Sequence, residues 1–380
     1  MMSESYFLYH SIGQYPGKAR ELTAAMAEFA FGWGRADDGQ WASALGQRAR
    51  FVDRWRAILN AAPGSVTTFE NVTQAVHSLV QSLPSGHLRG RKVLVAADCF
   101  PSNHFLLQGL AERHGFTLQT VPLRQGAAQV EDDDFLEAWG PQVGLALLTW
   151  VSSTASHRID LGRLVAHGRR MGSLIGVDIT QAAGLLPFDV SAPEVDFAVS
   201  TSLKWMCGTP GAGVLYLSPR LIPHCQPELR GWFSQADPFS WDITRFAFAP
   251  DIRRFDNGTP GVVAALASLP ALDWHAAQDH AALLAHNRSL CARIIAAADF
   301  LGLTLHSPRD PARRGGSVML RLPEKHPASA VVAALRAQGI TSDARGQVLR
   351  LSPGVMTTAE GCEKLIAVLG LVLAGQRGSR

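Results

Sequence analysis

Two charged residues follow apolar segments of the chain at positions where a reactive side chain would face a ligand. Asp178 closes an apolar run at 174–178, and Lys204 comes shortly after the next run, at 197–200. A lysine amine can form a Schiff base with an aldehyde, and a carboxylate can keep a ring nitrogen protonated. Together the two residues suggest chemistry on an aromatic aldehyde cofactor. Taken singly, Asp178 could simply cap the next helix, and Lys204 could be a solvated loop charge.

The segments around these residues alternate short apolar runs with helical patterns. Apolar runs of this length, separated by helices, are typical of a buried, mostly parallel sheet with helices on both faces. Ligands of such sheets bind beyond the carboxyl ends of the strands, so Asp178 and Lys204 are expected to meet at that edge. The predicted strands are 92–96, 145–150, 174–178, 197–200 and 213–217, and the predicted helices between them include 103–114 and 161–171.

A second, smaller α/β domain is predicted from the last third of the chain. We expect a large domain over residues 1–260 and a small C-terminal domain over residues 261–380, with the first residues of the chain able to pack against the small domain. The elements expected after residue 260 are a long helix at about 262–300, strands at 317–322 and 348–351, a helix at 328–338 and a closing helix from residue 359.

The composition is that of an ordinary globular protein and argues against several classes of partner. The chain has 380 residues, is 47% hydrophobic and carries a formal net charge of +3, which is too small to indicate nucleic-acid binding. No apolar run reaches the roughly 18 residues of a membrane span, and the N-terminus lacks a secretion signal. The cysteines are scattered without a metal-binding spacing, so we expect reduced thiols, no metal site and a cytoplasmic protein.

Pyridoxal 5'-phosphate (PLP) is a cofactor whose requirements these residues match. It needs a lysine for its aldehyde, an acid for its ring nitrogen, donors for its phosphate and a flat group against its ring. The turn Asn71-Val72-Thr73 opens an apolar helix, whose free N–H groups would bind the phosphate; an ordinary helix cap is an equally good interpretation. Thr201 is a second phosphate candidate. The glycine run at 207–213 leads into a strand, which does not fit a dinucleotide-binding pattern, and would let the backbone pass close to the cofactor.

At this point the chain resembles the class V aminotransferase family of fold-type-I PLP enzymes, and within it most resembles the kynureninases. The resemblance implies the aspartate-aminotransferase fold, PLP as cofactor, an α-amino acid as substrate and a homodimer. It covers nearly the whole chain. The segments that carry it are 6–13, 71–73, 98–103, 177–184, 196–200, Lys204 with the glycine run after it, 231–233 and 254–260.

The resemblance also assigns roles at the cofactor. Lys204 would hold PLP and, once freed by the substrate amine, act as general base, while Asp178 would keep the ring electron-poor. Phe100 would stack on the pyridine ring, with His104 as the less favoured candidate. Gln181 would hydrogen-bond the phenolic oxygen.

Further roles implied by the resemblance concern the substrate and the second subunit. Arg350 is similar to the arginine that grips the substrate α-carboxylate, a task for which its planar two-pronged donor is suited. His10 and Ser11, in the opening segment, would also contact substrate. Thr259 would reach the phosphate of the neighbouring subunit, and Trp232 lies in a stretch used near the cofactor, partly across the dimer interface.

Two departures from the family pattern leave the reaction open. Leu203 stands where kynureninases have a tyrosine and many other members have a histidine. Desulfurases of the family use a cysteine in a loop before the carboxylate-binding arginine, and this chain has no cysteine between Gly315 and Arg350. An aminotransferase is expected, with a lyase, an epimerase or a kynureninase-type hydrolase as alternatives. An NAD-dependent oxidoreductase and a catalytically inactive binding protein are the alternatives from other classes.

Overall fold

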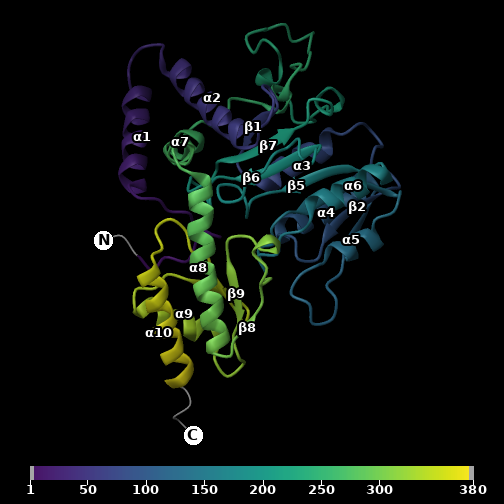
Figure 1. Cartoon of the computed structure of the whole chain (residues 1–380). Helices are drawn as coiled ribbons and strands as arrows, with labels where there is room; N and C mark the ends of the chain where they lie inside the picture. The colour runs from purple at the N-terminus through teal and green to yellow at the C-terminus, as the bar shows by residue number, and fades with distance from the viewer. Residues whose placement is uncertain (1–3, 376–380) are drawn as a thin grey trace.

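The computed structural model describes residues 4–375, and its larger part is built on a seven-stranded sheet (Figure 1). The strand order is β1-β7-β6-β5-β4-β2-β3. Strands β3, β2, β4, β5 and β6 pair in parallel, whereas β7 is antiparallel to both of its neighbours. The mostly parallel sheet expected from the apolar runs is therefore confirmed. The strands are β1 (Val66–Phe69), β2 (Lys92–Ala96), β3 (Thr117–Val121), β4 (Val143–Thr149), β5 (Leu174–Asp178), β6 (Phe197–Thr201) and β7 (Gly213–Leu217).

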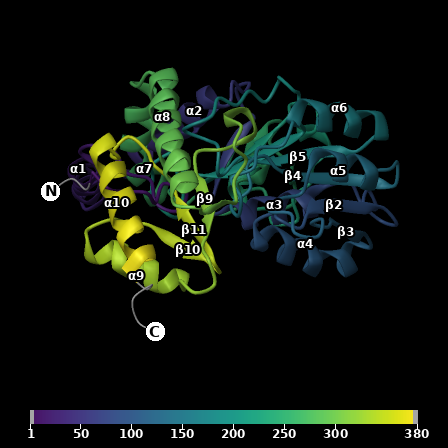
Figure 2. The same ribbon diagram turned by 60° about the horizontal axis from the view of Figure 1, so that its bottom comes forward.

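Helices cover both faces of this sheet because its strands are apolar on both sides. Along β2, Leu94 packs into one core and its neighbours Val93 and Val95 into another, as the alternation of side chains along a strand requires. Figure 2 shows α4 and α6 on opposite sides of the strands. The covering helices that follow the strands are α3 (Val72–Ser82), α4 (Pro101–His114), α5 (Asp132–Ala138) and α6 (Leu161–Met171).

Three further helices pack together at one end of the large sheet. They are α1 (Lys18–Trp33), α2 (Gln40–Ile58) and α7 (Val263–Ala276), and α7 contacts both of the others. Figure 1 shows the three side by side. None of the α1 residues is fully buried, so α1 takes part in this packing through partly buried side chains such as Phe29.

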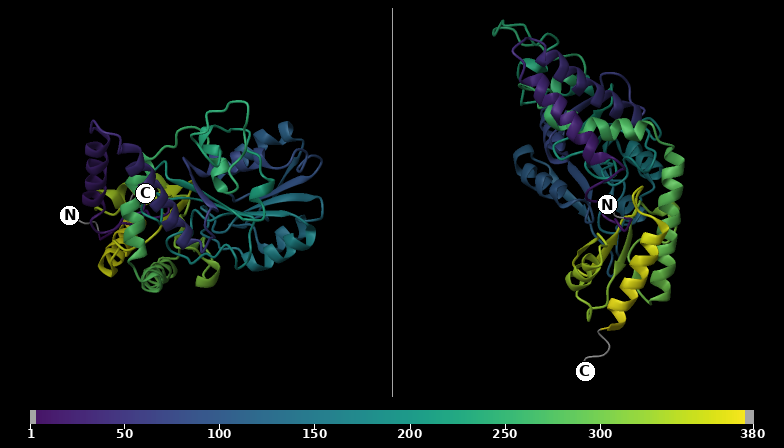
Figure 3. Two further views of the ribbon diagram at one scale, coloured as in Figure 1. Left: turned by 90° about the horizontal axis from the view of Figure 1, so that it is seen from above. Right: turned by 90° about the vertical axis from the view of Figure 1, so that its left-hand side faces the viewer.

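The smaller part is a four-stranded antiparallel sheet, in the order β10-β11-β9-β8, packed against three helices. Phe7 lies in its core, and Tyr6 and Leu8 form bridges to Thr341 and Ser352, so the first described residues do pack against it. Figure 3 shows this part extending below the large sheet. Its elements are α8 (His280–Phe300), β8 (Thr304–Leu305), β9 (Val318–Arg321), α9 (Ala328–Ala337), β10 (Asp343–Arg345), β11 (Val348–Leu351) and α10 (Ala359–Gly375).

The single helix predicted at 262–300 is wrong, because the chain breaks between α7 and α8. Asp279 caps the second helix by accepting hydrogen bonds from the N–H groups of Ala281 and Ala282. Helix α7 packs on α1 and α2, whereas α8 packs on the smaller sheet. The domain boundary at residue 260 stays a prediction. Short 3-10 helices complete the chain at Ile222–His224, Trp232–Ser234, Ile252–Phe255 and Pro311–Arg313.

Within residues 4–375 no helix is long and apolar enough to cross a membrane. The same residues contain no group of three or more His, Cys, Asp or Glu side chains arranged to hold a metal ion.

Candidate active site

A cavity of about 650 Å³ opens at the carboxyl edge of the large sheet. Asp178 at the end of β5, Thr149 at the end of β4 and Thr201 at the end of β6 line it together with Lys204. Parallel strands end at one edge of a sheet, which is why residues distant in sequence meet there. The structure thus brings Asp178 and Lys204, the two residues singled out in the sequence, into one cavity.

Lys204 is held in the cavity wall by a tightly packed loop. Gly13 donates its N–H to the carbonyl of Leu203 at 2.9 Å, and a Cβ at Gly13 would lie 1.8 Å from the carbonyl oxygen of Lys204. Cys207 donates its N–H to that same oxygen at 2.8 Å. The backbone on both sides of Lys204 is therefore fixed, and only its side chain can move.

The amine of Lys204 lies 5.2 Å from the centroid of the Phe100 ring. Burial lowers its pKa to about 8, against the opposing attraction of Asp178, and the positive charges of Arg350 and Arg345 lower it further. A lysine with this pKa is partly neutral near physiological pH, which a nucleophile or a general base requires.

Asp178 is buried and its carboxylate has two neutral donors. Asn103, on α4, donates from Nδ2 to one oxygen at 3.0 Å, and the N–H of Thr180 donates to the other at 2.9 Å. Both oxygens keep lone-pair capacity toward the cavity. Sequence reasoning missed Asn103, although it lies in the segment Phe100–Asn103 that was assigned to the cofactor, three residues after the aromatic ring.

The N-terminus of α3 faces the same cavity. Val72 and Thr73 line it, and the side chain of Asn71 caps the helix by accepting the N–H of Gln74 at 2.9 Å. The free N–H groups of a first helical turn favour an anion, and this turn lies in the cavity wall. Thr201 lines the cavity as well. Both candidates for phosphate binding, the turn at 71–73 and Thr201, therefore lie in the cavity wall.

Phe100 and Gln181 also line the cavity, as expected, whereas His104 does not. The His104 ring lies 3.0 Å from the hydroxyl of Thr120 instead. Gln181 donates from Nε2 to the carbonyl of His10 at 3.0 Å and accepts from the indole of Trp205 at 3.2 Å. Its amide is thereby fixed in orientation, with one N–H of Nε2 still free to donate.

Three hydroxyl oxygens in the cavity wall are buried and have no hydrogen-bond partner among residues 4–375. They belong to Thr149, Ser153 and Thr180. Buried polar atoms are nearly always paired in folded proteins, so these hydroxyls are suited to receive a polar ligand. The sequence signal for them was weak, because single hydroxyl residues at strand ends are common.

Arg350 and His10 meet at a carboxylate that sequence reasoning did not identify. Arg350 donates to Asp343 from Nε at 2.8 Å and from a second guanidinium nitrogen, while Nε2 of His10 lies 2.9 Å from Asp343. Nδ1 of His10 lies 2.6 Å from the hydroxyl of Ser352. Burial by itself would raise the pKa of Asp343, but His10 and Arg350 outweigh it and lower the pKa to about 2.

The remaining predicted site residues do not line the cavity of their own chain: His10, Ser11, Trp232, Thr259 and Arg350. The N–H of Ser11 closes a turn onto the carbonyl of Leu8. Trp232 stacks on Trp241, with ring centroids 6.3 Å apart. Thr259 lines an adjacent depression of about 450 Å³ that shares Glu70, Gln74 and Gly211 with the cavity.

One wall of the cavity is tied directly to the smaller sheet. Val151 and Ser153 line the cavity, and the loop that follows them is bonded to the segment before β9. Gly315 donates its N–H to the carbonyl of Ser156 at 2.7 Å, and Arg158 donates its N–H to the carbonyl of Arg313 at 2.8 Å.

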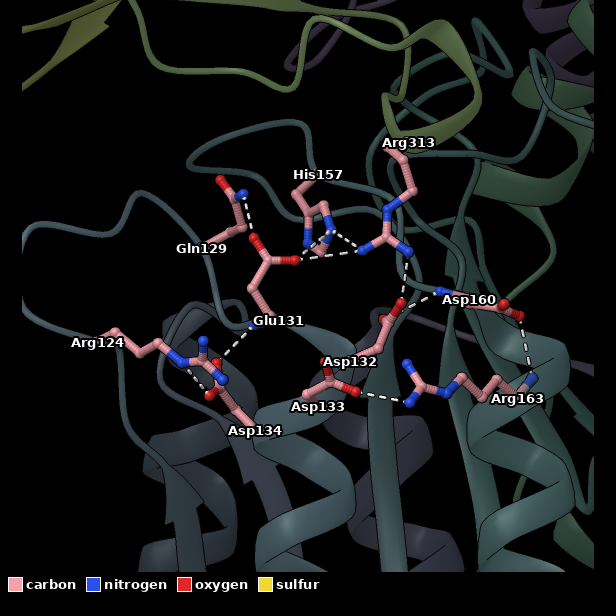
Figure 4. A network of polar contacts seen from close by, with 10 residues as sticks. All are labelled: Arg124, Gln129, Glu131, Asp132, Asp133, Asp134, His157, Asp160, Arg163 and Arg313. Carbon is pink, nitrogen blue, oxygen red and sulfur yellow. Dashed lines mark hydrogen bonds and ion pairs between the residues drawn. The ribbon is translucent and has the colours of Figure 1, made fainter.

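A charged network reinforces this connection (Figure 4). The guanidinium of Arg313 donates to Asp132, to Glu131 at 3.3 Å and to Nε2 of His157 at 2.9 Å. A guanidinium can only donate, so Nε2 of His157 is the acceptor of this bond. Burial lowers the pKa of His157, although Glu131 opposes this effect, which favours the neutral ring that the bond requires. The position of the smaller sheet therefore helps to set the position of the cavity wall.

Comparison with known proteins places these residues in context. Residues 47–353 match the family model described as aminotransferase class-V. The kynureninase of Deinococcus radiodurans is 32% identical over a match that covers 74% of this chain and 65% of that protein. The kynureninase of Pseudomonas fluorescens is 27% identical, with 88% and 80% covered, and the uncharacterized aminotransferase YcbU of Bacillus subtilis is 25% identical, with 84% and 82% covered.

Solved structures share the fold at lower identity. The apo cysteine desulfurase of Thermococcus onnurineus superposes with a TM-score of 0.85 at 19% identity, covering 97% of this chain and 94% of that one. The cystine C–S lyase C-DES, in complex with cysteine persulfide, superposes with a TM-score of 0.85 at 21% identity, covering 96% and 97%. A C-DES variant with glycine covalently linked to its PLP cofactor gives 0.84, also at 21% identity and with 96% of each chain covered.

Proposed function

Because the chain belongs to the class V aminotransferase family, we propose that it is a PLP-dependent enzyme acting on an α-amino acid, with Lys204 as the residue that binds the cofactor aldehyde covalently. The observation that carries this proposal is the presence of the Lys204 amine, the Asp178 carboxylate and the N-terminus of α3 in one cavity. These are the lysine, the acid and the phosphate donors that the cofactor requires.

The residues of the cavity fit the cofactor. Asp178 would face the ring nitrogen, Phe100 the ring, and Val72, Thr73 and Thr201 the phosphate. The unpartnered hydroxyls of the wall offer hydrogen bonds to its polar substituents. When bound, PLP supplies an electron sink for the negative charge that develops at the substrate Cα.

The chain's own residues divide the remaining work. Lys204 removes and returns the proton at Cα, for which a pKa of about 8 suits it. Asn103 and the N–H of Thr180 fix the Asp178 carboxylate, so that it needs no reorganisation during the reaction. Arg350 would orient the substrate through its α-carboxylate, and that orientation selects the bond that breaks.

We propose transamination as the reaction, with kynurenine-type hydrolysis as the second candidate. Transamination needs one group that removes a proton and returns it, and Lys204 can do both without a second acid or base. Hydrolytic C–C cleavage needs a further proton donor, and Leu203, the cavity residue beside Lys204, has none. The relatives named kynureninase favour the second candidate. No described cysteine lines the cavity, which argues against desulfurase chemistry.

We further propose that the protein is a homodimer and that Trp232 and Thr259 serve the partner's cavity. Large apolar side chains are exposed in the segment after Trp232, with Phe239 69%, Trp241 77% and Ile243 98% exposed. Phe239 and Trp241 both pack against Trp232, and exposed apolar side chains that gather in this way typically mark a protein interface. A cytoplasmic location is also proposed, and the free cysteine thiols are compatible with it.

The test is a panel of L-amino acids offered to the PLP-loaded protein. Transamination predicts that a substrate bleaches the visible absorption band and that a 2-oxo acid restores it. Release of anthranilate and alanine from kynurenine would favour the hydrolytic candidate instead. If no amino acid changed the spectrum, the protein would be an inactive binding protein and the proposal would be wrong.

A further inference from the structure

The face of the smaller sheet that is turned away from its own core carries arginines. Leu349 and Leu351 of β11 lie in that core, and Ala344 of β10 packs against it. Side chains alternate along a strand, so Arg350 projects from the opposite face, as do Asp343 and Arg345. Asp343 pairs directly with Arg350 across the two strands.

Arg350 is not a free cation on this face. Its side chain is 9% exposed and its charge is met by Asp343, which accepts from Nε and from one terminal nitrogen. The pair carries no net charge, yet Arg350 keeps Nη1 without a partner among residues 4–375. It can therefore orient a carboxylate by hydrogen bonding, but the attraction that draws an anion from water must come from another residue.

Arg345 can supply this attraction. It is the last residue of β10, next to the hairpin turn at Gly346, and its side chain is exposed. It forms no hydrogen bond or ion pair within the described part of the chain. Arg345 and Asp343 project from the same face of β10. Asp343 contacts His10, whose carbonyl accepts a hydrogen bond from Gln181 in the cavity wall, so this face is turned toward the cavity. The charge of Arg345 accordingly helps to lower the pKa of Lys204.

We propose that Arg345 is a second carboxylate-binding residue, which holds the substrate α-carboxylate together with Arg350. Arg350, fixed by Asp343, sets the direction of the carboxylate, and Arg345 provides the uncompensated positive charge. Two guanidinium groups then share one carboxylate, which has lone pairs enough for both. This inference rests on the proposed function, because it takes an α-amino acid as the substrate.

The test compares Arg345→Gln with Arg321→Gln in the PLP-loaded protein. Arg321 is a matched control, because it is exposed and lies on the same face, opposite Val348, which in turn pairs with Arg345. We expect Arg345→Gln to raise KM for α-amino acids roughly 10- to 100-fold, the usual range for losing a hydrogen bond to a charged group. An amine without a carboxylate should react equally well with both variants.

A KM for α-amino acids unchanged by Arg345→Gln, with the wild type active, would overturn this inference alone. A wild type that responds to no amino acid would overturn the proposed function on which the inference rests. Independently of turnover, the pKa of Lys204 can be measured in the cofactor-free protein by NMR of lysines labelled with ¹³C-methyl groups. Arg345→Gln should raise that pKa and Arg321→Gln should not; equal values would show that Arg345 does not face the cavity.

Discussion

Replacing Lys204 with methionine should stabilise the cofactor-free protein while abolishing its activity. The ordinary pKa of a lysine is 10.5, and in the folded chain that of Lys204 is lowered to about 8, mainly by burial. Below pH 8 the folded protein holds a charged ammonium in this buried wall, whereas in the unfolded chain the same ammonium is exposed to water. Methionine has a similar length, fills the same space and carries no charge.

The size and the pH dependence of the effect follow from the two pKa values. Their difference corresponds to a loss of about 3 kcal/mol in the unfolding free energy of the wild type. This loss is present in full below pH 8. Between pH 8 and 10.5 the unfolded chain binds more protons than the folded one, so the stability of the wild type rises with pH across this window. This shift already includes the opposing attraction between Lys204 and Asp178, so we expect the variant to gain up to about 3 kcal/mol at pH 7.

Urea denaturation of both cofactor-free proteins at pH 7, 9 and 10.5 measures this difference. The advantage of Lys204→Met should shrink as pH rises and should be small at pH 10.5. Lys364→Met is a suitable control, because Lys364 is exposed on α10 and its replacement should have little effect at any of these pH values. A Lys204→Met variant less stable than the wild type at pH 7, or a pH-independent difference, would refute the reasoning.

Three further predictions concern the remaining parts of the site. Asp178→Asn keeps the shape of the side chain but removes its charge, so kcat should fall while PLP still binds; an unchanged kcat would show that Asp178 does not face the ring. Arg350→Leu should lower kcat/KM for every α-amino acid by roughly 30-fold to several thousand-fold, the range for truncating one partner of a desolvated charge pair, and should spare an amine without a carboxylate. Sedimentation of the wild type should show a dimer, and mixing Lys204→Ala with Thr259→Ala chains should restore PLP affinity at one of two sites; a fully active monomer would exclude the shared site.

The central part of the site could be predicted from sequence because it depends on strand ends. The apolar runs that end at Asp178 and precede Lys204 identify β5 and β6, and parallel strands bring their carboxyl ends to one edge. The helix opening at Asn71 was likewise marked by its capping residue. In each case the sequence signal was local, and the geometry of a parallel sheet supplied the rest.

Other features could not be predicted, for identifiable physical reasons. Helix α1 has no fully buried residue, and its apolar side chains, such as Phe29, are only partly buried against a core, which makes its apolar stripe a weak signal. Strand β3 lies at the edge of the sheet and is only partly buried, which weakens its apolar pattern. The pairs Asn103–Asp178 and Asp343–Arg350 depend on packing and register, and no local spacing in the sequence fixes either.

The central claim is that Lys204 binds the cofactor, and borohydride trapping tests it most directly. The protein is loaded with PLP, reduced with borohydride, digested and analysed by mass spectrometry for a phosphopyridoxyl group. The account predicts the modification on the peptide that contains Lys204 and its absence from Lys18, Lys92, Lys325 and Lys364. A stoichiometric modification at any of those lysines, or none at all in a protein that binds PLP, would contradict it.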